Sequence, residues 1–98
     1  MKILIVEDEP ALRELIQRSL EKERYVTETA ADFDSALEKI EVYDYDCILL
    51  DIMLPGGSGL ELLGRLKELR KKENVIIISA KDSLEDKVLG LELGADDY

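Results

Sequence analysis

The chain has 98 residues, of which 46% are hydrophobic, and a chain of this length and composition forms one domain around one core. The chain has 13 Lys and Arg residues and 23 Asp and Glu residues, which give a net charge of −10. This negative charge repels phosphate backbones and anionic lipids. We therefore expect this segment neither to bind nucleic acid directly nor to associate with a membrane. The single cysteine, Cys47, excludes a disulfide framework and favours a reduced, cytoplasmic setting.

Four short apolar runs alternate with longer amphipathic stretches, at residues 3–6, 25–30, 47–50 and 75–78. This alternation predicts the order βαβαβαβα. Three of the amphipathic stretches carry apolar residues at helical spacing, and we expect each set to pack into the core: Leu12, Leu15, Ile16 and Leu20; Phe33, Ala36, Leu37 and Ile40; Leu62, Leu63, Leu66 and Leu69. The spacing of Ser58 and Glu61 predicts a capped helix start. Ser83 and Asp86 predict another, with a helix stop at Gly94.

The composition of the four runs predicts their order in a sheet. "ILIV", "CILL" and "VIII" are apolar on both faces, as in central parallel strands, whereas "YVTETA" interleaves polar residues and is typical of an edge. With right-handed crossovers, this predicts a flavodoxin-like, doubly wound parallel α/β sheet in the order 2-1-3-4. Because "VIII" is too apolar for an exposed edge, we expect residues 1–98 to be a truncated domain that lacks a fifth βα unit. A chain that ends at Tyr98 is then expected to self-associate.

Side chains that carry chemistry follow three of the predicted strands. Glu7 and Asp8 follow the first strand, Asp51 the third, and Ser79 the fourth. In open α/β sheets, ligands bind beyond the carboxyl ends of the strands, so we expect these side chains to converge in one crevice. Each also has a simpler interpretation: the acids are typical of helix caps, and the serine of a turn.

Three carboxylates in one crevice repel one another, which raises at least one pKa unless a cation compensates. Oxygen ligands without histidine or thiolate favour a hard cation, and Mg²⁺ fits because it uses few carboxylates together with water and phosphate oxygens. Asp51 is the candidate nucleophile toward a phosphoryl group, and the glycines of "MLPGGSG" allow close backbone approach.

Four motifs occur in order along the chain: "ILIVEDEP", "DCILLDIMLPGGSGLELL", "VIIISAKDS" and "LGLELGADDY". Together they resemble the CheY-like receiver domain of bacterial two-component response regulators. The sequences "DIMLPGGSG" and "GADDY" are most similar to those of receivers of the OmpR/PhoB type, which are usually joined to a DNA-binding winged helix. The resemblance covers essentially all of the chain. It implies that the chain is a phosphorelay switch and not an enzyme in the usual sense, because such a domain assists only its own phosphorylation and dephosphorylation.

The resemblance also implies roles for individual residues. Asp51 matches the phosphoacceptor, Asp8 a direct Mg²⁺ ligand, and Glu7 a ligand that acts through water. Met53 matches the position whose backbone carbonyl completes the metal site. Ser79 matches the switch hydroxyl, and Ala80 the small residue that leaves room for the phosphoryl group. The family's phosphate-contacting lysine and its aromatic switch partner belong to the missing fifth unit, and Lys81 does not replace that lysine.

The implied partners are a sensor histidine kinase, as phosphoryl donor, and DNA only through a missing C-terminal domain. Three alternatives remain open. A degenerate receiver would act only as a protein-interaction module. A haloacid-dehalogenase-like phosphatase also uses an aspartate nucleophile with Mg²⁺, but it requires a second acidic residue at the position where this chain has Met53. A flavodoxin-like FMN or nucleotide binder would place its phosphate loop where "EDEP" is repulsive.

Overall fold

The computed structural model of the chain describes residues 1–69 and 74–78. Its elements follow in chain order: β1 (Lys2–Val6), α1 (Pro10–Lys22), β2 (Val26–Ala30), α2 (Phe33–Val42), β3 (Cys47–Asp51), β4 (Met53–Leu54), β5 (Gly57–Ser58), α3 (Gly59–Glu68) and β6 (Asn74–Ile78). The four predicted strands correspond to β1, β2, β3 and β6, each within one residue at either end. The helix expected between Ser83 and Gly94 lies outside the described residues. No helix in the described part of the chain is both long and apolar enough to span a bilayer.

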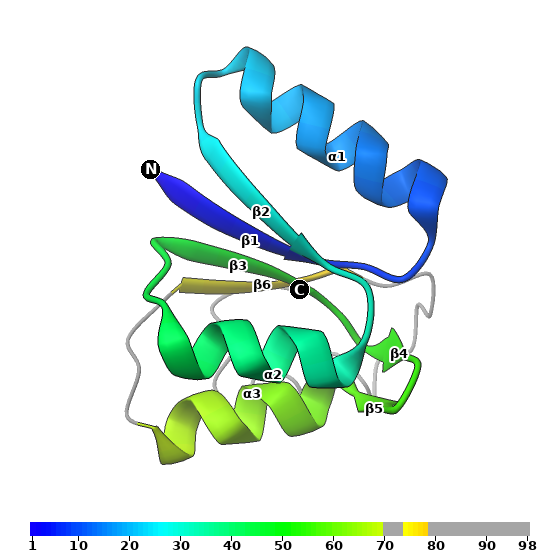
Figure 1. Cartoon of the computed structure of the whole chain (residues 1–98), viewed down its shortest axis with the longest axis vertical. Helices are drawn as coiled ribbons and strands as arrows, with labels where there is room; N and C mark the ends of the chain where they lie inside the picture. Colours follow the sequence, from blue (N-terminus) through cyan, green and yellow to red (C-terminus); the bar gives the residue numbers. More distant parts are fainter. Residues whose placement is uncertain (70–73, 79–98) are drawn as a thin grey trace.

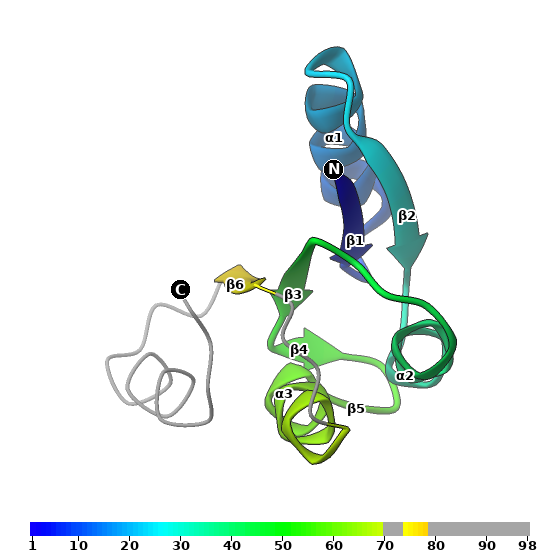
Figure 2. The ribbon, with the colours of Figure 1, turned by 90° about the vertical axis from the view of Figure 1, so that its left-hand side faces the viewer.

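The main sheet has four parallel strands in the order β2-β1-β3-β6. This is the predicted order 2-1-3-4, and the predicted flavodoxin-like fold is confirmed. Helix α1 lies on one face of the sheet, and α2 with α3 on the other (Figures 1 and 2). The register pairs Val6 with Leu50 and Asp51 with Ile78, so β1, β3 and β6 end at nearly the same level. Residues that follow these strands therefore start from one edge of the sheet.

The core lies between the sheet and the α2–α3 layer. Alternate residues of the strands point into it and are almost completely buried: Leu4, Val6, Ile48, Leu50, Val75 and Ile77. The helices contribute the predicted apolar faces, of which Ala36, Ile40, Leu62, Leu63 and Leu66 are buried. Leu69 is an exception, because it is the C-cap of α3 and is 46% exposed. The predicted edge strand, β2, does lie at the edge, where its Glu28 forms a 2.8 Å ion pair with Lys2 of β1.

The prediction that the apolar face of α1 packs into the core is wrong for two of its four residues. No residue of α1 is buried, and Leu12 and Leu15 are 42% and 62% exposed. Within residues 1–69 and 74–78, α1 packs on β1 and β2 but has no neighbouring helix on its face of the sheet. On this face, Leu49 of β3 and Ile76 and Ile78 of β6 are only half-buried. One helix is too narrow to cover four strands.

The glycine-containing segment after β3 forms a short antiparallel hairpin, which was not predicted from the sequence. Met53 of β4 pairs with Ser58 of β5, and Gly56 takes the turn position with a φ of 86°, which favours glycine. Ser58 then caps α3 as predicted, its hydroxyl accepting the N–H of Leu60 at 3.1 Å. Hydrogen bonds thus hold both the hairpin and the start of α3.

Two glycines bring this segment close to its neighbours. A Cβ on Gly59 would overlap the carbonyl oxygen of Asp51 and approach the Cα of Ile52 to 2.9 Å. A Cβ on Gly57 would lie 2.6 Å from the ring of Phe33 on α2. The absence of side chains at these positions therefore sets the distance from α3 to the end of β3, and from the hairpin to α2.

We predict that Gly59→Ala and Gly64→Ala have opposite effects on stability, although both glycines lie on α3. A Cβ on Gly64 would meet no atom of a neighbouring element within 4 Å, so alanine there removes a flexible helix residue and should stabilise by up to about 1 kcal/mol. Alanine at position 59 must displace the backbone of Asp51 and should destabilise by about 1–3 kcal/mol. Urea denaturation of both variants measures the difference. Stabilisation by both substitutions would contradict the close packing at Gly59.

We also predict that a polypeptide of residues 1–98 self-associates through the α1 face, because association removes from water the apolar side chains of Leu12 and Leu15, which are exposed in the described part of the chain. Its melting temperature should then rise with protein concentration. Leu15→Glu places a charge on this face and should weaken association by about tenfold or more. Val42→Glu is a matched control, since Val42 is 66% exposed but lies on α2. A folded monomer with a melting temperature independent of concentration, seen by sedimentation, would refute the prediction.

Candidate functional site

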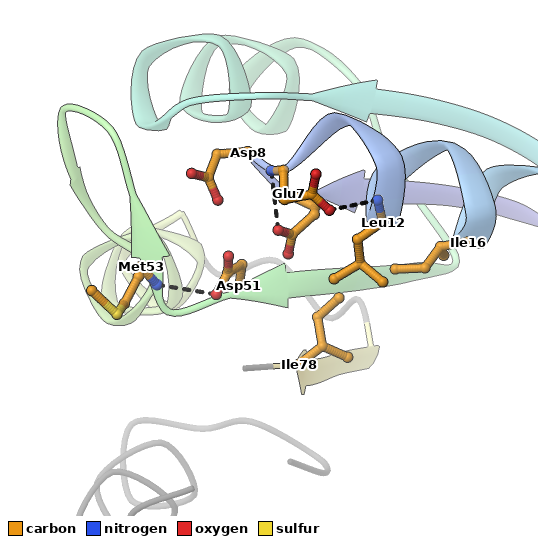
Figure 3. Close-up of a pocket in the computed structure, with 8 residues that line it drawn as sticks. Glu7, Asp8, Leu12, Ile16, Asp51, Met53 and Ile78 are labelled. Carbon is orange, nitrogen blue, oxygen red and sulfur yellow. Dashed lines mark hydrogen bonds between the residues drawn. The ribbon is translucent and has the colours of Figure 1, made fainter. Parts of the chain in front are cut away.

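Three carboxylates meet beyond the adjacent ends of β1 and β3. Asp51 is the last residue of β3, and Glu7 and Asp8 are the first two residues after β1. One oxygen from each of the three lies within 4.8 Å of the other two, and Figure 3 shows all three pointing into the same space. The pairing of Val6 with Leu50 accounts for this, because the next residue on each strand is one of the acids. The expected convergence of these acids is therefore present in the structure.

The carboxylates form the polar end of a cavity of about 590 Å³. Glu7 and Asp51 are only 4% and 7% exposed, whereas Asp8 lies at the open rim. The opposite end of the cavity is apolar and is lined by Leu12 and Ile16 of α1 and Ile78 of β6 (Figure 3). Among the described residues that line it, there is no lysine or arginine. The buried acids thus have no cationic side chain beside them in this part of the chain.

The alternative interpretation of Asp8 as a helix cap does not hold. The cap of α1 is Glu9, whose carboxylate accepts the N–H groups of Ala11 at 3.2 Å and Leu12 at 2.8 Å. Pro10 follows as the first helical residue, where its missing N–H costs nothing. Sequence reasoning missed Glu9 because aspartate is the more usual cap, although a glutamate directly before a proline was a signal for it. The side chain of Asp8 is left directed toward Asp51 (Figure 3).

Backbone groups orient the two buried acids. The N–H of Glu9 donates to Glu7 Oε1 at 3.1 Å, and the N–H of Met53 donates to Asp51 Oδ1 at 3.1 Å. On the α1 side, the guanidinium of Arg13 donates to the carbonyl oxygen of Glu7 at 3.0 Å and approaches that of Asp8 at 3.4 Å. Sequence reasoning also missed Arg13, because its contact depends on how the loop folds back against the helix.

Burial dominates the electrostatics of the site. It raises the pKa of Glu7 from 4.5 to about 7, an effect that the N–H of Glu9 opposes and that the nearby carboxylates of Asp51 and Asp8 reinforce. Burial also raises the pKa of Asp51. The sequence predicted a raised pKa from repulsion among the acids, and the structure adds burial as the larger cause. A divalent cation would relieve both effects, and an all-oxygen donor set with two buried carboxylates fits a hard cation such as Mg²⁺.

Of the other predicted site residues, Met53 is the one that lies within the described part of the chain. Met53 lines the cavity from β4, with its N–H on Asp51 and its side chain 63% exposed. Ser79 and Ala80 lie outside the described residues. Ile78, which precedes them in the sequence, lines the cavity at the end of β6.

Comparison with known proteins agrees with this geometry. The family model of the response regulator receiver domain matches residues 3–98. The chain is 45% identical over 97 residues to the alkaline phosphatase synthesis transcriptional regulatory protein PhoP of Bacillus subtilis, covering 99% of the chain and 40% of that protein. It is 47% identical over 98 residues to the transcriptional regulatory protein DltR of Streptococcus agalactiae, covering all of the chain and 44% of the regulator. The chain thus spans less than half the length of these relatives.

Among solved structures, the chain is similar to the response regulator protein TrrA of Thermotoga maritima in complex with Mg²⁺ and BeF. The TM-score is 0.88 at 36% identity, and the match covers 99% of this chain and 83% of that one. The relatives are transcriptional regulators, as the resemblance to the OmpR/PhoB type suggests. With a family match over nearly its whole length and the fold of a solved response regulator protein, the chain belongs to the response regulator receiver domain family.

Proposed function

We propose that the chain is a phosphorelay switch that accepts a phosphoryl group on Asp51 from a sensor histidine kinase, with Mg²⁺ bound at the adjacent acids. The convergence of Glu7, Asp8 and Asp51 within 4.8 Å carries this proposal, because it combines a candidate nucleophile with an oxygen-rich cation site. The likeness to TrrA, which was solved in complex with Mg²⁺ and BeF, supports it.

Each acid has a separate part in the proposed reaction. A carboxylate oxygen of Asp51 attacks the phosphorus of the phosphorylated imidazole, a P–O bond forms as the P–N bond breaks, and the departing imidazole takes a proton from solvent. Asp8 would hold the cation directly, Glu7 would hold it through water, and the backbone carbonyl of Met53 would complete the set. When bound, Mg²⁺ neutralises the negative charge that the phosphoryl group brings. The N–H of Met53 on Asp51 Oδ1 keeps the nucleophile oriented.

The switch itself is assigned to residues after β6. We propose that Ser79 turns toward the phosphoryl group and that Ala80 leaves space for it. Charge added at Asp51 then biases the segment that follows β6 between two conformations, and the output is altered binding. A degenerate receiver, which would bind partners without phosphorylation, remains the competing function, and phosphoryl uptake separates the two.

We further propose that the chain is part of a longer cytoplasmic transcription regulator. It spans 40% and 44% of the two regulators above, and 83% of the TrrA chain. In this proposal a further βα unit covers the half-buried α1 face of β3 and β6, and a separate C-terminal domain binds DNA. The exposed leucines of α1, Leu12 and Leu15, support the first part, because an additional helix beside α1 would bury them.

We predict that Asp51→Asn abolishes phosphoryl uptake from a small donor such as acetyl phosphate. The amide is nearly the same size but is not a nucleophile, so incorporation should fall to background, and wild-type uptake should require Mg²⁺. Asp34→Asn is the matched control, because Asp34 is exposed on α2. Intact-mass spectrometry measures the added phosphoryl group. Undiminished labelling of the Asp51 variant would refute the assignment, and an unlabelled wild type would favour the degenerate receiver.

We predict that the metal-free protein loses stability as the pH rises from about 4.5 to about 7. The pKa of Glu7 is about 7 in the folded state and 4.5 ordinarily, so across this window the folded state holds a proton that the unfolded state has lost. The raised pKa of Asp51 acts in the same direction. Glu7→Gln should flatten the slope and stabilise by about 3 kcal/mol at pH 8.

Urea denaturation in EDTA at several pH values tests this prediction. Glu38→Gln serves as the control, because Glu38 is exposed on α2 and its substitution should leave the slope unchanged. Added Mg²⁺ should restore stability to the wild type near pH 8. A Glu7→Gln variant with the wild-type pH slope would contradict the assignment of the slope to Glu7.

A further inference from the structure

Arg13 is the fourth residue of α1, and its side chain returns to the loop that carries the acidic pair. Its Nη1 donates to the carbonyl oxygen of Glu7 at 3.0 Å and lies 3.4 Å from that of Asp8. The side chain is half-buried. It therefore bonds to the backbone of two candidate metal ligands without bonding to their carboxylates.

This choice of acceptors matters for a cation site. An arginine paired with a carboxylate would compete with the metal for the same oxygens and would bring a positive charge into the cavity. A guanidinium on the carbonyl side of the loop leaves the carboxylate oxygens of Glu7, Asp8 and Asp51 within reach of one another. Arginine suits this position, because its planar group presents several donors in a rigid arrangement.

Three other interactions hold the loop in the described part of the chain. The N–H of Glu7 donates to the carbonyl of Ala30 at 3.1 Å, the N–H of Glu9 donates to Glu7 Oε1 at 3.1 Å, and the carboxylate of Glu9 caps α1. None of these engages the carbonyl oxygens of Glu7 and Asp8, whose orientation determines how the peptide planes between β1 and α1 are turned. Those planes in turn set the direction in which the two side chains leave the backbone.

We propose that Arg13 is a positioning residue for the Mg²⁺ site: its guanidinium holds the backbone of Glu7 and Asp8 so that their carboxylates face Asp51. The proposal rests on the proposed function, since it concerns the same site. Arg13 touches neither the metal nor the phosphoryl group and acts only through the loop.

The sign of the effect on Mg²⁺ affinity distinguishes this role from the two obvious alternatives. If Arg13 acted only as a nearby positive charge, its removal would reduce repulsion and tighten Mg²⁺ binding. If it only stabilised the fold, its removal would lower the free energy of unfolding and leave Mg²⁺ affinity unchanged. A positioning role predicts weaker binding although the net charge of the protein becomes more negative.

The test compares Arg13→Ala, Arg13→Lys and Arg18→Ala in the intact chain. Arg18 is a matched control, because it lies on the same helix and is exposed, with an ion pair to Glu14. The readouts are the Mg²⁺ dissociation constant, from calorimetry, and the amide chemical shifts of Asp8 and Glu9, with urea denaturation to confirm folding. Asp8→Ala gives the size of the effect of removing a proposed ligand.

We expect Arg13→Ala to raise the Mg²⁺ dissociation constant about five- to twentyfold, the range expected for losing hydrogen bonds made by a charged donor. Arg13→Lys keeps the charge and one donor and should recover part of the affinity, while Arg18→Ala should change it less than about twofold. Unchanged or tighter Mg²⁺ binding by a folded Arg13→Ala variant would overturn the positioning role of Arg13 and leave the proposed function intact. A wild-type chain that binds no Mg²⁺ would overturn the metal site of the proposed function, and this inference with it.

Discussion

The burial of two carboxylates at the adjacent ends of β1 and β3 is the constraint on which the rest of this structure depends. Glu7 and Asp51 are both more than nine-tenths buried, and carboxylates are seldom buried without a compensating partner. Parallel register brings them together, since Val6 pairs with Leu50 immediately before them. The apolar core on either side, from Leu4 to Ile77, makes that register unfavourable to shift, because a slip by one residue would turn buried side chains toward solvent. Stability of the sheet and geometry of the site thus have one cause.

The surrounding loops reduce the cost of this arrangement through backbone groups. The N–H groups of Glu9 and Met53 each reach one of the buried acids, and Arg13 binds the carbonyl side of the same loop. None of these contacts places a cationic side chain on the carboxylates, so among the described residues the negative charge stays available to a ligand from solution. The raised pKa of Glu7 has the same cause, because a buried carboxylate without a cation beside it binds a proton more readily.

The sequence predicted those features that depend on local pattern and on the topology of parallel sheets. The runs that became β1, β3 and β6 are continuously apolar, which is typical of central strands in a parallel sheet, and their order placed Glu7, Asp8 and Asp51 at one edge. The sequence did not predict the burial of side chains that depends on which other element packs against them. The spacing of Leu12 and Leu15 is that of a core helix, yet both are exposed, because helical periodicity does not reveal whether a neighbouring helix is present. Backbone contacts such as those of Glu9 and Arg13 carry no periodic signal at all.

The close approach of Gly57 to Phe33 has a consequence for how such sequences can vary. The N–H of Phe33 donates to the carbonyl of Pro55 at 3.1 Å, so the start of α2 is tied to the hairpin that follows Asp51, and the aromatic ring occupies the space in which a side chain at position 57 would lie. Neither residue can change freely while the other stays. A larger residue at 57 needs a smaller one at 33, and related sequences that keep this contact should therefore show the two positions changing as a pair, although they lie 24 positions apart in the chain.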